Sequence, residues 1–143
     1  MGTWGTGPFD NDTAADFSYT LDEAALGERE QVLRGVLVRT VEAIGYLTEA
    51  EEAVAAAAVI AAHCPGGRPI DTAYGPKQSL PVLSEDLRAL AVAALDRVTA
   101  DESGLAGTWG DPGDARQWLS MIKSLRDVLV PAPVAHDVPL FDV

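Results

Sequence analysis

The side chains best suited to chemistry lie near the start of the chain, in the stretch F-D-N-D-T-A-A-D-F. Asp10, Asp12 and Asp16 supply closely spaced carboxylates, which are the ligands that Ca²⁺ and other hard cations prefer. The stretch departs from a calcium-binding loop, because alanines occupy the positions of a ligand and of the turn glycine, and no glutamate closes the loop. Carboxylates at a helix start also satisfy its free amides and its dipole. We therefore interpret the stretch as a helix start that Asp10, Asn11 or Asp12 caps, with a metal site as the alternative.

A second set of candidate groups lies in the stretch P-G-G-R-P-I-D-T-A-Y-G-P-K. Arg68, Tyr74 and Lys77 concentrate positive or hydrogen-bonding groups in an otherwise acidic chain. The stretch lacks the G-K-[ST] of a P-loop and the G-x-G-x-x-G of a dinucleotide site. The whole connection, residues 65–82, exceeds the roughly 12–15 residues of most unstructured loops. It therefore either binds a ligand or packs onto the helices, and we favour the packed connector.

Nucleophile and base candidates do not combine into a catalytic set. His63 and Cys64 are adjacent, so on a helix their side chains point about 100° apart. His136 and Asp137 could orient a base toward Cys64, but nothing in the sequence brings them together. Four-coordinate zinc would need further ligands from a chain with one cysteine. We predict no catalytic residue, no metal site and no cofactor.

The segment G-T-W-G occurs twice, at residues 2–5 and 107–110, each time ahead of a predicted helix start. Trp4 and Trp109 could line a pocket or a partner groove. Alternatively, they anchor the loop entrances onto the helices while the glycines let the backbone turn over them. We favour the anchor, which predicts that both indoles are buried over their own helix entrances. Trp118, at a helical core position, is predicted to lie in the core.

Apolar periodicity predicts five helices and no strand. The first follows the aspartate cluster, the second covers about residues 28–44, and the third follows the capping box T-E-A-E at residues 48–51. Ser84 is predicted to cap the fourth helix, and Pro112 to begin the fifth. Gly35, in mid-helix, predicts a close helix crossing.

The third helix reads A-V-A-A-A-A-V-I-A-A over residues 53–62 and is apolar on every side. A helix of that kind belongs in the middle of a bundle, where small side chains let its neighbours approach closely. We therefore predict an all-α, single-domain bundle over residues 1–143. Its N-terminal, central and C-terminal segments are predicted to be irregular.

The composition limits the classes of partner and the cell compartment that fit this chain. The 143 residues contain 22 Asp and Glu against 10 Lys and Arg, a formal net charge of -12. This charge argues against nucleic acid and anionic membranes. It fits either a basic protein partner or a charged face that only keeps the protein in solution. No apolar run reaches the roughly 18 residues of a bilayer span, and no secretory leader is evident. The single cysteine fits a reducing compartment, so we predict a cytoplasmic protein.

The opening residues resemble the domain of unknown function 4259 family, bacterial proteins that begin with a G-x-W-G … F-x-N-D-x-A-x-D-aromatic signature. The matching positions are Gly2, Trp4, Gly5, Phe9, Asn11, Asp12, Ala14, Asp16 and Phe17. The resemblance implies a small bacterial cytoplasmic helical protein and supplies no activity or catalytic residue.

Two functional hypotheses follow. The first is a small, acidic, non-catalytic protein-interaction or regulatory module, of which an immunity- or antitoxin-like role is one version. The second is a small-molecule or metal-binding protein that uses the aspartate cluster and the two G-T-W-G loops. A homo-oligomer is compatible with either hypothesis. The candidate ligand- or partner-binding residues are Trp4, Phe9, Asp10, Asn11, Asp12, Asp16, Arg68, Tyr74, Lys77 and Trp109.

Overall fold

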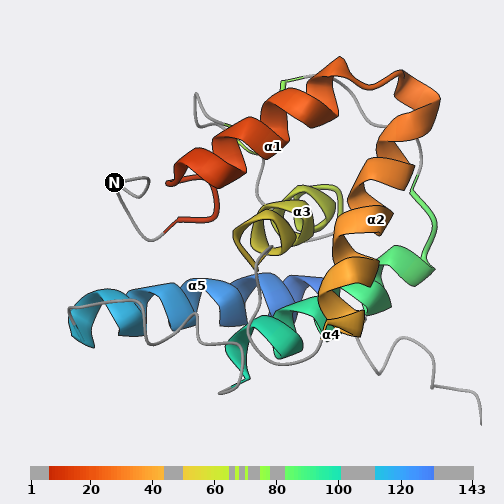
Figure 1. Ribbon diagram of the computed structural model, residues 1–143. Helices are drawn as coiled ribbons and strands as arrows, with labels where there is room; N and C mark the ends of the chain where they lie inside the picture. Colours follow the sequence, from red (N-terminus) through yellow and green to blue (C-terminus); the bar gives the residue numbers. More distant parts are fainter. Residues whose placement is uncertain are drawn as a thin grey trace, which may run out of the picture.

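The computed structural model describes residues 7–43, 50–64, 67, 70, 75–77, 83–100 and 112–130, and every regular element in these ranges is helical (Figure 1). In chain order the elements are α1 (Asp12–Glu23), the 3₁₀ turn η1 (Leu26–Glu28), α2 (Arg29–Glu42), α3 (Ala50–Ala62), α4 (Asp86–Thr99) and α5 (Pro112–Leu129). The prediction of an all-α bundle of about five helices is confirmed. The predicted capping box at residues 48–51 and most of the predicted irregular segments lie outside the described residues.

The centre of the bundle is α3, as its all-round apolar sequence predicts. It packs against α1, α2, α4 and α5, and in Figure 1 it runs between α1 on one side and α5 on the other. Alanine has no side chain beyond Cβ, so neighbouring helix axes can approach to roughly 8 Å. The buried residues of α3 come from every face of the helix: Ala50, Ala53, Val54, Ala55, Ala56, Ala57, Ala58, Val59, Ile60 and Ala61.

Each surrounding helix buries one stripe toward α3 or its neighbours and turns the other face outward. Leu90 and Leu125 are half-buried at the edge of the core. The buried residues of the four helices are Ala14, Phe17, Ser18 and Leu21 in α1, Leu33, Val36, Leu37 and Thr40 in α2, Leu87, Ala91, Ala94, Leu95 and Val98 in α4, and Trp118, Ile122 and Leu129 in α5.

Two of the predicted helix starts are correct. Asn11 is the N-cap of α1: its backbone is extended, and its side-chain Oδ1 accepts a hydrogen bond from the Ala14 amide at 2.7 Å. The first residue of α5 is Pro112, a position where the missing amide hydrogen costs nothing. Helix α2 ends two residues before the predicted boundary, because Ala43 is already extended with ψ 149°.

Two local predictions are wrong. Ser84 does not cap α4 with its side chain, because its hydroxyl donates to Glu30 Oε2 at 2.9 Å. Gly35 does not mark a close helix crossing among the described residues. A Cβ placed there meets the guanidinium of Arg39, on the same helix, at 3.2 Å, and no atom of another helix within 4 Å.

Candidate functional site

The N-terminal candidates fall into two groups, and the first group points inward. Phe9 is 4 % exposed and belongs to the hydrophobic core, while Asn11 is 8 % exposed and caps α1. Asp10 folds back over the preceding turn, where its Oδ2 accepts the Gly7 amide at 3.0 Å. Asn11 is therefore the cap of α1, whereas the capping interpretation is wrong for Asp10, whose carboxylate accepts an amide ahead of the helix.

The second group, Asp12 and Asp16, faces solvent one helical turn apart on α1. In the part of the chain that the structure describes, no three His, Cys, Asp or Glu side chains gather into a group that could hold a metal ion. The metal-binding alternative for the aspartate cluster therefore gains no support from the described residues. Asp12 instead lies in the first turn of α1, where a carboxylate interacts favourably with the helix dipole.

A row of exposed side chains runs along the solvent side of α1, which we call the α1 outer face: Asp12, Asp16, Tyr19 and Glu23. The intervals are four, three and four residues, so at 100° per residue the row falls within an arc of about 60°. Tyr19 is 68 % exposed, the largest value among the exposed large apolar side chains of the described residues. The row therefore presents an aromatic ring among carboxylates.

The electrostatic setting of the α1 outer face is strongly negative. The first basic residue in the sequence is Arg29, and residues 1–28 contain six carboxylates and no Lys or Arg. These six charges are half of the net charge of -12, although residues 1–28 make up about a fifth of the chain. Among the described residues no ion pair is formed by the carboxylates of the α1 outer face.

The C-terminal end of α1 is fixed by two polar contacts. Arg29 donates through Nε to the Ala24 carbonyl at 3.0 Å and through Nη2 to the Asp22 carbonyl at 3.3 Å, so it satisfies carbonyls that the helix leaves open. The Asp22 carboxylate accepts the backbone amide of Lys77 at 3.0 and 2.9 Å. These contacts hold the helix, and hence its outer face, at a set position.

Lys77 is the one candidate of the central connection that the structure describes. Its ammonium donates to the Gly75 carbonyl at 3.2 Å, and its amide is bound by Asp22. This arrangement supports the packed-connector interpretation at residues 75–77. Arg68, Tyr74, Trp4 and Trp109 lie outside the described residues, so their binding or anchoring roles stay predictions.

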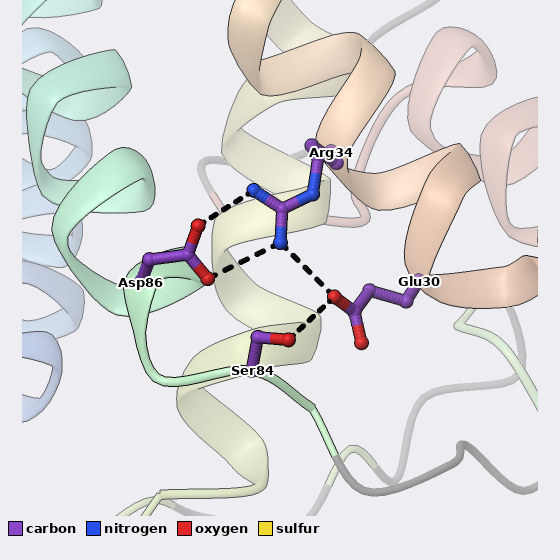
Figure 2. Close-up of polar contacts among 4 residues, drawn as sticks. All are labelled: Glu30, Arg34, Ser84 and Asp86. Carbon is purple, nitrogen blue, oxygen red and sulfur yellow. Dashed lines mark hydrogen bonds and ion pairs between the residues drawn. The ribbon is translucent and has the colours of Figure 1, made fainter.

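A polar cluster joins Arg34 of α2 to the start of α4. We call it the Arg34 clasp, and it consists of Glu30, Arg34, Ser84 and Asp86 (Figure 2). Arg34 donates through Nη1 and Nη2 to the two Asp86 carboxylate oxygens, at 2.8 and 3.2 Å, and through Nη2 to Glu30 at 3.0 Å. Residues more than 50 positions apart in the sequence are thereby joined, and α2 is tied to the first turn of α4.

Hydrogen bonding in the Arg34 clasp moves three pKa values. The bonds to Asp86 and then to Glu30 raise the pKa of the Arg34 guanidinium above its usual value. The bond from Arg34 lowers the pKa of the Asp86 carboxyl, and the bonds from Arg34 and Ser84 lower that of Glu30. All three groups are therefore charged at neutral pH, and the clasp is an electrically satisfied structural contact.

Other arginines are also engaged inside the bundle. Arg88 donates to the carbonyls of Leu129 and Val128 at 3.0 and 3.2 Å, which caps the C-terminal end of α5 with a positive charge. Arg97 donates through Nε and Nη2 to the Ala43 carbonyl at 3.2 and 3.0 Å, just after α2. Arg34, Arg88 and Arg97 thus hold the ends of neighbouring helices.

The nucleophile and base candidates at the end of α3 bond to their own helix. His63 Nδ1 lies 2.9 Å from the Val59 carbonyl, and Cys64 Sγ donates to the Ile60 carbonyl at 3.4 Å. Both contacts satisfy carbonyls of the last turn of α3. His136 and Asp137 lie outside the described residues, so their predicted lack of a joint role with Cys64 stays a prediction.

Comparison with known families decides the relationship of the chain. The sequence profile of a family described as Domain of unknown function (DUF4259) matches residues 2–121. The chain belongs to this family. No curated protein and no solved structure matches the chain. None of the described helices combines the length and the hydropathy that crossing a bilayer requires.

Tyr19, Glu23 and the Arg34 clasp of this DUF4259 chain are not among the residues predicted from the sequence. A signal for the first two is present in the sequence: the 4-3-4 spacing from Asp12 to Glu23, and the lack of any basic residue before Arg29. In the Arg34 clasp, only the Glu30–Arg34 pair, four residues apart on α2, has a local signal. The contacts with Ser84 and Asp86 form only when α2 and α4 pack.

Proposed function

We propose that this DUF4259 protein is a small, non-catalytic interaction module of the bacterial cytoplasm that binds a basic protein partner. Immunity- or antitoxin-like cover of such a partner is one form of this function. The observation that carries the proposal is the unequal use of charge. Arg34, Arg88 and Arg97 bond within the bundle, whereas the carboxylates of the α1 outer face point into solvent.

Physical reasons connect this distribution to binding. A net charge of -12 on 143 residues produces a long-range field that speeds the approach of a basic protein and repels nucleic acid. Residues 1–28, with six carboxylates and no Lys or Arg, give that approach a direction. The single cysteine of the chain fits a reducing compartment, which supports the cytoplasmic part of the proposal.

Affinity capture tests the proposal. The full chain is immobilised and exposed to a native lysate of its source organism at about 0.15 M salt, where charges are screened beyond roughly 8 Å. An unrelated acidic protein of similar size and net charge is the control. We expect one or a few basic proteins on the chain and not on the control, and their release as the salt rises toward about 0.5 M.

A chain that retains no protein beyond the control at low or moderate salt contradicts the proposal. In parallel, elemental analysis and a thermal-shift screen test the alternative function. A stoichiometric metal, or a small molecule that raises the melting temperature, would favour a ligand-binding protein instead.

A further inference from the structure

We draw no further inference here: the strongest candidate, the row of exposed carboxylates around Tyr19 on the α1 outer face, is an acidic surface patch, and nothing among the described residues shows what covers it.

Discussion

Helices α1 and α5 cover the same central helix from opposite sides, yet they differ in what they present to solvent (Figure 1). Their inner faces are alike, because each buries one large aromatic side chain, Phe17 in α1 and Trp118 in α5. The outward side of α1 contains exposed carboxylates without a cation. That of α5 contains an ion pair at an interval of four residues, Lys123 with Asp127, at 3.1 Å.

This difference in exposed charge separates side chains that stabilise the fold from side chains that are available to a partner. In α5, the charges compensate one another: Lys123 pairs along the helix, and Arg126 pairs with Asp96 of α4 at 2.8 Å. In α1 every charged side chain is negative, so no charge within the helix offsets another. Both helices pack against the bundle through their buried apolar side chains, so the uncompensated charge of α1 is not needed for packing. Four measurements test the inner faces, the helix ends and the charges of the bundle.

The largest expected effect concerns the inner faces. Phe17→Ala and Trp118→Ala should each lower the free energy of unfolding by about 3–5 kcal/mol, because each removes a large buried side chain and leaves a cavity. Chemical denaturation followed by circular dichroism measures both variants. A loss confined to one of them would contradict the equivalence of the two inner faces.

The start of α1 should give a smaller effect. Asn11→Ala removes the acceptor of the Ala14 amide and should cost about 1 kcal/mol of stability. Asn11→Ser, which keeps a capping oxygen, is the matched control and should cost much less. If both variants lose the same amount, the cap is not what orders α1.

The third measurement concerns the Arg34 clasp and its pH dependence. The pKa values of Glu30 and Asp86 are lowered in the folded protein from ordinary values of 4.5 and 3.8. The stabilisation is therefore present above those values and is lost as the pH falls below them through the lowered ones. Arg34→Met should melt below the wild-type protein at pH 7, and the two melting temperatures should converge in acid.

Arg116→Met is the control for the clasp, because Arg116 is exposed and also carries one positive charge. It should leave the melting temperature nearly unchanged across the same pH range. An equal pH-dependent loss in both variants would assign the effect to net charge and not to the clasp.

The smallest expected effects have opposite signs in the two outer helices. Glu23→Gln should raise the stability by about 0.3 kcal/mol, because it removes a negative charge from the negative end of α1. Lys123→Gln should lower it by about 0.3 kcal/mol, because it removes the ion pair with Asp127. Thermal melts at low and high salt measure both, and the two differences should shrink as salt rises. A stability loss in Glu23→Gln would contradict an unfavourable charge at the C-terminal end of α1.

The parts of the fold that depend on neighbours in sequence were predictable. Asn11 lies three residues before the amide that it caps. The continuous apolar sequence of α3 predicts that this helix is buried on every side. The contact of Ser84 was not predictable, because its hydroxyl donates to Glu30, 54 residues away, and does not cap the nearby start of α4. The contact between Asp22 and Lys77 spans 55 residues and likewise depends on tertiary packing. Local patterns therefore gave the elements, while their polar contacts required the assembled bundle.

That last contact has an evolutionary consequence. Asp22 binds the backbone amide of residue 77 and not its side chain. Every amino acid except proline supplies that amide. The contact therefore requires a hydrogen-bond acceptor at position 22, whereas it allows almost any side chain at position 77. Among relatives of this chain, we expect acidic or amide side chains to persist at position 22 and proline to be avoided at position 77. A lysine retained at 77 across such relatives would then indicate selection on its side chain, whose ammonium donates to the Gly75 carbonyl.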